Sequence, residues 1–321
     1  MHGTHLVAHL VSLSLVVILF DGGAGLGLVR PGRLWGPILT LGLLGTLLVT
    51  AGLAAGMHWL ADFGWYPALL LAAAFAPTDP AIVFALIRES HTERSAVGIV
   101  LEGESGANDP VGIAIVAALL AAGGADGHSL AHAGGTLLQQ LVLGAAVGYL
   151  GGRLTRRVGH PAIALLAAFA AYGIADLAGG SGFLAAFGVG IGRGHRRGSG
   201  LPGPVVTGAR LAAFALLALT LHPDVLRHAD VWGRGLALGA LATVLVRPAA
   251  TALCLWRSRL TLRSRLQVGW IGLKGAVPLL LGLQLVVEGA PDAARLYGIV
   301  VIAVAFSLAV QGGTVTPVMR R

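Results

Sequence analysis

The sequence has little charge, one cysteine and one lysine. Only 11% of its 321 residues are charged, whereas soluble globular domains carry about 25%. Cys254 is the only cysteine, so an intrachain disulfide is excluded. These shortages exclude an ordinary soluble domain, a disordered chain and a disulfide-stabilised secreted module. Instead, 56% of the residues are hydrophobic and 49 are glycine, which is typical of closely packed membrane helices.

Apolar segments run through the whole chain. A helix that spans a bilayer needs about 20 mostly apolar residues. This length predicts eleven spans, at 4–22, 35–60, 66–87, 95–122, 136–154, 160–178, 181–193, 207–222, 231–255, 265–288 and 294–315. The predicted fold is therefore an all-α polytopic membrane protein. It forms a single transmembrane domain over residues 1–321, with no soluble domain.

The basic residues predict the orientation of these spans. The segments after the odd-numbered spans hold Arg30, Arg33, Arg88, Arg94, Arg153, Arg156, Arg157, Arg193, Arg196, Arg197, Arg257, Arg259, Arg263, Arg265, Arg320 and Arg321. Positively charged loops mark the cytoplasmic side. We expect a multi-pass protein of the plasma membrane with its N-terminus outside and its C-terminus in the cytoplasm. The net charge of +8 follows from these loops and requires no nucleic acid partner.

Two of the spans carry signals for a helix break. Pro77 and Pro80 flank Thr78 and Asp79 in the third span, and Gly272, Lys274 and Gly275 precede Pro278 in the tenth. Proline removes a backbone donor and disfavours helix in the residue before it. Irregular backbone at membrane depth is tolerated only where it is buried or lines a cavity. We expect Asp79 to offset the positive helix ends there and Lys274 the negative ones.

The two breaks also predict an inverted repeat. They lie seven spans apart, and helices an odd number apart run in opposite directions. The first to fourth spans would then repeat as the eighth to eleventh, and the sixth and seventh would lack partners. We therefore expect two further helices to precede the first span in the complete fold. Paired interrupted helices are a sequence indication of a transporter site.

The fourth span concentrates oxygen-bearing side chains. Ser105 and Asp109 are four residues apart and share a helix face, with Glu104 and Asn108 beside them. A carboxylate, a hydroxyl and an amide form an oxygen-rich site that suits a hard cation. Charges at membrane depth cost at least roughly 2.5–3.5 kcal/mol on insertion scales and mark functional positions.

These motifs together resemble one family of transporters. The segments that carry the likeness are 18–23 (ILFDGG), 77–80 (PTDP), 103–105 (GES), 108–110 (NDP), 180–186 (GSGFLAA), 247–248 (RP) and 272–278 (GLKGAVP). The chain resembles the monovalent cation:proton antiporters, specifically NhaP-like, CPA1-type sodium or potassium/proton exchangers. The resemblance covers essentially the whole chain. It implies about thirteen helices with two broken helices crossing near the midplane, and a homodimer.

The resemblance also implies residue roles. Asp109 would bind the cation or the proton, helped by Asn108, Ser105, Thr78 and Asp21. The expected ligands of Na⁺ or K⁺ are oxygens of Asp109, Ser105 and Thr78. The structural charges at the crossing would be Asp79, Lys274, Glu104 and Arg247. Glu104 would pair with Lys274, which stands where the family usually has Arg.

The predicted activity is secondary active antiport rather than enzymatic catalysis. Cation and proton would compete for Asp109, and one titrating carboxylate implies electroneutral exchange by family analogy. No cofactor is expected, and the partners are a monovalent cation, protons and membrane lipid. Two alternatives stay open: a sodium-coupled symporter on a similar fold, and a truncated or non-transporting paralogue.

Overall fold

The computed structural model describes residues 2–27, 31–79, 95–156, 158, 160–193, 200–220 and 223–320. Within these ranges the chain is helical, without strands, which confirms the all-α prediction. Among the described residues, six helices are long and apolar enough to cross a membrane, and five shorter apolar helices accompany them. Each of the eleven predicted segments overlaps one of these helices. The second half of the third span, 80–87, lies outside the described residues, as do Arg30, Arg88, Arg94, Arg157, Arg196, Arg197 and Arg321.

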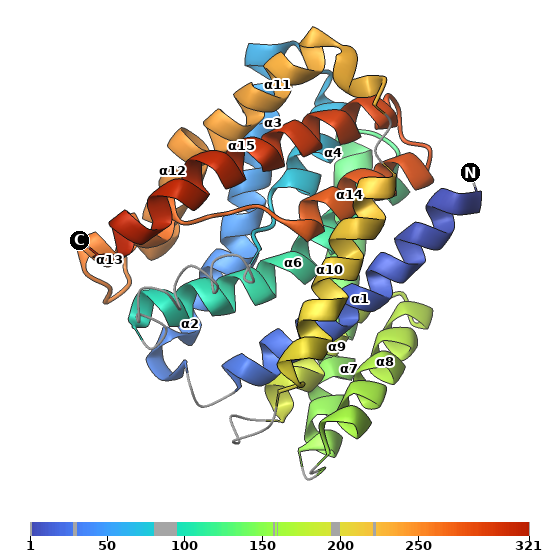
Figure 1. The fold of residues 1–321 in the computed structure, drawn as a ribbon, viewed down its shortest axis with the longest axis vertical. Coiled ribbons are helices and arrows are strands. Elements are labelled where there is room, and N and C mark those ends of the chain that lie inside the picture. The colour runs from blue at the N-terminus through green and yellow to red at the C-terminus, as the bar shows by residue number, and fades with distance from the viewer. Residues whose placement is uncertain are drawn as a thin grey trace.

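The helices fall into continuous, π-interrupted and short types (Figure 1). Continuous helices are α1 (His2–Leu26), α6 (Ala96–Ala122), α7 (Gly127–Thr155) and α15 (Ala293–Arg320). Two runs contain a π-helical segment: α2 (Trp35–Leu39), η2 (Thr40–Gly45) and α3 (Thr46–Ala61), then α11 (Ala229–Ala240), η4 (Leu241–Val246) and α12 (Arg247–Leu255). Short helices are α4 (Trp65–Phe75), α8 (Pro161–Leu177), α9 (Gly182–Gly192), α10 (Gly203–Leu219), α13 (Leu262–Trp270) and α14 (Ala276–Val287).

Local sequence signals fix where several helices begin and end. The Ser95 hydroxyl accepts a hydrogen bond from Gly98 N at 3.0 Å and so caps the start of α6. The Asp126 carboxylate caps α7 in the same way, because it accepts hydrogen bonds from two backbone amides of the first turn. Such caps satisfy N–H groups that a helix leaves unpaired at its start. Gly123 adopts the left-handed conformation after α6, with φ of 69°, and ends that helix.

The inverted repeat predicted from the two breaks has a second structural signature. The second and ninth spans, which are also seven apart, are the ones that contain the π-helical segments η2 and η4. Both breaks in the third and tenth spans are present as well. The second and ninth spans pack directly on each other, and Gly52 and Gly56 of α3 approach Val246 and Leu241. The two spans of each related pair therefore have the same kind of irregularity: a π-helical segment in the second and ninth, and a break in the third and tenth.

The helices around the breaks occupy the middle of the molecule (Figure 1). In that view α4, α6 and α14 lie between a group made of α7, α8 and α9 and a group made of α11, α12 and α15. The α7–α9 contact depends on small residues: a side chain at Gly144 would collide with Ser181, and one at Gly152 with Gly192. Close backbone approach of this kind is the usual way membrane helices associate.

Candidate ion-binding site at the helix crossing

The third span is broken where the two prolines predict it. Helix α4 ends at Phe75, and the chain from Pro77 to Asp79 is non-helical. Pro77 lacks an N–H and disfavours helix at the residue before it. Thr78 and Asp79 are buried. The break therefore places backbone polar groups and two polar side chains inside the protein.

The tenth span is broken as well. Helix α13 ends at Trp270, the chain is non-helical from Ile271 to Gly275, and α14 begins at Ala276. Glycine is required at position 275 because Asp79 approaches its backbone closely, and a Cβ atom there would overlap the Asp79 carboxylate. The two non-helical segments are joined by a hydrogen bond of 2.8 Å from Asp79 N to Leu273 O. The broken spans thus meet directly.

Asp79 and Lys274 contact opposite kinds of helix end at this crossing. The Asp79 Oδ2 atom accepts a hydrogen bond of 3.3 Å from Ala276 N, at the start of α14. The Lys274 Nζ atom donates to Ala76 O at 2.6 Å, at the end of α4, and lies 5.1 Å from the centre of the Phe75 ring. A helix start carries a partial positive charge and a helix end a partial negative charge. Each side chain therefore opposes the charge it faces.

Helix α6 brings the oxygen-rich motif to the same place. Thr78 Oγ1 lies 2.8 Å from Ser105 Oγ and accepts a hydrogen bond of 2.8 Å from Asn108 Nδ2. The Thr78 N–H also donates to Asn108 Oδ1 at 3.3 Å. The structure therefore joins three predicted site residues, Thr78, Ser105 and Asn108, in one hydrogen-bond network.

Asp109 lies beside this network on α6 and is only 2% exposed. Its Oδ1 atom is buried and has no hydrogen-bond partner within the described residues. Asp79 and Lys274 act on it electrostatically. A buried carboxylate oxygen without a partner is costly, so it is the atom of this site best placed to take up a cation or a proton.

The predicted pairing of Glu104 with Lys274 is wrong. Glu104 instead pairs with Arg247 of α12, through bonds of 2.8 Å from Nη1 to Oε1 and 3.1 Å from Nη2 to Oε2. The planar guanidinium matches two carboxylate oxygens at once, whereas an ammonium cannot. Arg247 Nη2 also donates to Ile271 O at 2.8 Å and Val268 O at 3.2 Å. It thereby caps the end of α13, which leaves Lys274 for the end of α4.

Asp21 lies in a different environment from the Thr78 network. It belongs to the second half of α1, and its Oδ1 atom accepts a hydrogen bond of 2.9 Å from Leu201 N, just before α10. The described hydrogen bonds of Thr78, Ser105 and Asn108 do not include it. The structure therefore ties Asp21 to the segment that leads into α10, and its predicted role as an ion ligand stays a prediction.

Two polar residues of α15 support the crossing and were not singled out from the sequence. Ser307 Oγ accepts a hydrogen bond of 3.2 Å from Lys274 N and donates to Gln311 Oε1 at 2.7 Å. Gln311 Nε2 donates to Trp270 O at 2.6 Å. Both side chains are buried in an apolar span. Their spacing of four residues, which places them on one helix face, was the signal available in the sequence.

Comparison with known proteins assigns this architecture to a class of membrane exchangers. The family model described as "Sodium/hydrogen exchanger, transmembrane" matches residues 1–321. The chain therefore belongs to the sodium/hydrogen exchanger family.

Individual relatives agree with this assignment. The K⁺/H⁺ antiporter NhaP2 of Shewanella sp. (strain MR-4) is 32% identical over 338 residues, which cover 98% of this chain and 57% of NhaP2. The K⁺/H⁺ antiporter NhaP of Alkalimonas amylolytica is 32% identical over 340 residues, with the same coverage. The solved structure of the sodium proton antiporter MjNhaP1 from Methanocaldococcus jannaschii at pH 8 superposes with a TM-score of 0.80 at 18% identity. That match covers 99% of this chain and 86% of MjNhaP1. The chain spans little more than half the length of the curated relatives.

Proposed function

We propose that the chain exchanges a monovalent cation, Na⁺ or K⁺, for protons by competition for Asp109. The observation that carries the proposal is the buried Asp109 Oδ1 atom, which has no hydrogen-bond partner among the described residues. On α6, Asp109 directly follows Asn108 and lies four residues after Ser105, both of which belong to the Thr78 network. Oxygen ligands of this kind suit a hard cation. The names of the K⁺/H⁺ and Na⁺/H⁺ antiporters that resemble the chain support the same activity.

Coupling follows from the cost of a bare charge inside a membrane. An empty Asp109 carboxylate resists movement through the low-dielectric interior. Bound to one proton or one monovalent cation, it is locally neutral and crosses more easily. Asn108, which cannot titrate, leaves a single site for the two ions. We therefore infer one-for-one, electroneutral exchange without a cofactor.

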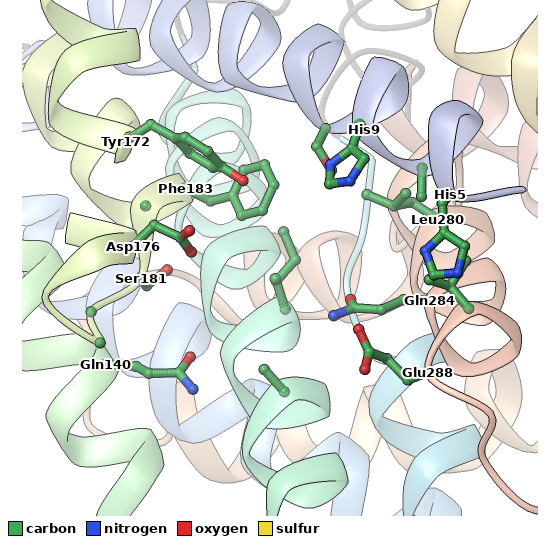
Figure 2. Close-up of a pocket in the computed structure, with 18 residues that line it drawn as sticks. His5, His9, Gln140, Tyr172, Asp176, Ser181, Phe183, Leu280, Gln284 and Glu288 are labelled. Atoms are coloured by element: carbon green, nitrogen blue, oxygen red, sulfur yellow. The ribbon is translucent and has the colours of Figure 1, made fainter. Parts of the chain in front are cut away.

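A polar cavity supports a path for ions to this carboxylate. The cavity, called here the histidine cavity, has a volume of about 550 Å³. Figure 2 shows His5 and His9 on one side, Asp176 and Gln140 on the other, and Glu288 below the histidines. Ile113 also lines it and follows Asp109 by four residues. One helical turn, about 5.4 Å of rise, therefore separates a wall of the cavity from the proposed binding residue.

The proposed setting is the plasma membrane, with the N-terminus outside and the C-terminus in the cytoplasm. The arginine distribution supports this orientation, and it places the histidine cavity on the outer side. We also propose a homodimer, on the resemblance to the exchanger family alone. The mass of the purified chain in detergent tests that point.

Cation-induced proton movement in vesicles is the direct test. A pH-sensitive dye inside vesicles that contain the chain should report proton movement when Na⁺ or K⁺ is added. Asp109→Asn should abolish the response, with a loss of at least a hundredfold, because an amide cannot exchange protons. Asp126→Asn is the matched control, since Asp126 is an exposed carboxylate and Asn also caps helices well. Its response should be unchanged.

The folding of the Asp109→Asn variant is checked separately. Replacing a buried carboxylate by a neutral amide removes a desolvation cost, so its melting temperature should be equal or higher. Continued exchange by a folded Asp109→Asn chain would contradict the proposed mechanism. Absence of exchange by the folded, unmodified chain would contradict the proposed function.

A further inference from the structure

A second hollow lies far along the chain from the Asp109 motif. It has a volume of about 810 Å³ and lies between α12, α13 and the end of α15. Its apolar walls include Ala252, Trp256, Leu262, Leu266 and Val318. Trp256, Leu262 and Leu266 are more than 60% exposed. We call this hollow the α12–α13 groove.

One end of the groove is strongly basic. Arg263 lines the groove and, within the described chain, makes no hydrogen bond or ion pair that would neutralise its guanidinium. The guanidinium of Arg257 lies 5.1 Å from the centre of the Trp256 ring. No carboxylate is among the residues that line the groove. The groove therefore combines an apolar surface with uncompensated positive charge.

Arg265, at the same end, binds backbone carbonyl groups of the protein itself. Its guanidinium donates to Trp256 O at 3.2 Å, Ser258 O at 2.6 Å and Leu260 O at 3.1 Å. These bonds fix the turn that joins α12 to α13 and hold the mouth of the groove in shape. Arg263 also lies in the first turn of α13, where the helix presents free N–H groups and a partial positive charge. Such a helix start favours an anion.

We propose that the α12–α13 groove binds an anionic phospholipid. The phosphate would contact Arg263 and the start of α13, and an acyl chain would lie along Trp256, Leu262 and Leu266. Arginine donates two parallel hydrogen bonds to a phosphate, and basic residues next to a membrane span attract anionic lipids. The proposal does not depend on antiport. A neutral lipid would satisfy the apolar walls but leave Arg263 without a counter-charge.

Binding here would stabilise the site at the helix crossing indirectly. Helix α13 leads directly into the non-helical segment Ile271–Gly275. It is held to α15 by a bond of 3.0 Å from Gln267 Nε2 to Val318 O and another of 3.0 Å from Trp270 Nε1 to Thr314 Oγ1. A lipid bound between α12, α13 and α15 would add contacts that stabilise the packing of α13 against α15. We expect the lipid to raise the melting temperature of the protein.

Lipid selectivity of the purified chain tests the proposal. Phosphatidylglycerol, phosphatidylcholine and inorganic phosphate are added separately to the delipidated chain in a neutral detergent. Retained lipid is counted by native mass spectrometry, and melting is followed in parallel. Phosphatidylglycerol should be retained at least fivefold more than phosphatidylcholine and should raise the melting temperature. Equal retention of the two lipids, or equal stabilisation by phosphate alone, would overturn the proposal.

Variants assign the selectivity to this groove. Arg263→Gln should remove most of the preference for phosphatidylglycerol, because it removes the charge that faces the groove. Arg153→Gln is the matched control: Arg153 is an exposed arginine of α7 outside the groove, so the preference should persist. Ala252→Trp should fill the groove and reduce retention of both lipids. An unchanged preference in Arg263→Gln would count against the proposal, whatever the transport activity.

Discussion

The buried charged side chains around the crossing have different surroundings. Arg247 pairs with Glu104 and donates to two carbonyl groups through its terminal nitrogens, and only its Nε atom has no partner within the described residues. Lys274 is satisfied by a carbonyl and lies over an aromatic ring. Asp109 differs, because within the described residues its carboxylate forms no ion pair and its Oδ1 atom accepts no hydrogen bond. A charged group with partners is expected to hold the fold, whereas one without a partner is available to bind an ion.

Glu104→Gln should strongly destabilise the protein. It leaves the Arg247 charge buried without a counter-charge, and breaking a buried pair costs about 3–5 kcal/mol. Thermal unfolding in detergent measures the effect. The exposed pair of Asp224 and Arg227 gives the control, since Asp224→Asn should change stability by less than about 1 kcal/mol. A melting temperature of Glu104→Gln equal to the control would show that the buried pair contributes little.

At the scale of elements, the breaks in the third and tenth spans create the site. Continuous helices would satisfy their own backbone groups and leave none for other partners. Here the end of α4 and the start of α14 present unpaired groups to Lys274 and Asp79. Ser307 and Gln311 then hold the non-helical part of the tenth span against α15. The irregular backbone is stable because it is buried and supplied with partners.

Gly275→Ala should disrupt this crossing. A methyl group there would overlap the Asp79 carboxylate, so either the non-helical segment or Asp79 must move. We expect a lower yield of monodisperse protein and a lower melting temperature, measured by size-exclusion chromatography and thermal unfolding. Gly313→Ala is the matched control, because a methyl group at Gly313 of α15 meets nothing within 4 Å. If both variants behave like the unmodified chain, the crossing is looser than described.

At the scale of the whole molecule, related spans carry related irregularities. The second and ninth spans contain π-helical segments, and the third and tenth are broken. Because each pair is seven spans apart, its members have opposite orientations in the membrane. The broken span of each half, the third and the tenth, lies at the centre of the fold. Inverted repeats of this kind are common in transporters whose site lies at the repeat interface.

The proposed orientation predicts which loops react with an impermeant maleimide. Cys254, the only native cysteine, is first replaced by serine. A cysteine at Gly127 should then react in intact cells, whereas one at Arg259 should react only after permeabilisation. Both positions are exposed, so a difference in labelling reports sidedness rather than burial. The reverse pattern would invert the orientation inferred from the arginines.

The sequence alone determined the spans, the breaks and most of the oxygen-bearing site. Hydropathy, proline and glycine act locally, so the number of spans and the break before Thr78 could be predicted without knowing what packs on them. Ser105, Asn108 and Asp109 could be grouped because they lie on one helix.

Only the tertiary structure decided the long-range partners. The resemblance assigned Glu104 to Lys274, whereas the structure pairs it with Arg247, and nothing local in the sequence distinguishes these two basic residues. The choice depends on which helix ends lie nearby and on the match between a planar guanidinium and a carboxylate. The same holds for Asp21 and for Gln311, whose hydrogen-bond partners, Leu201 and Trp270, are 180 and 41 residues away along the chain. Such contacts are set by how the helices pack, and hydropathy carries no information about them.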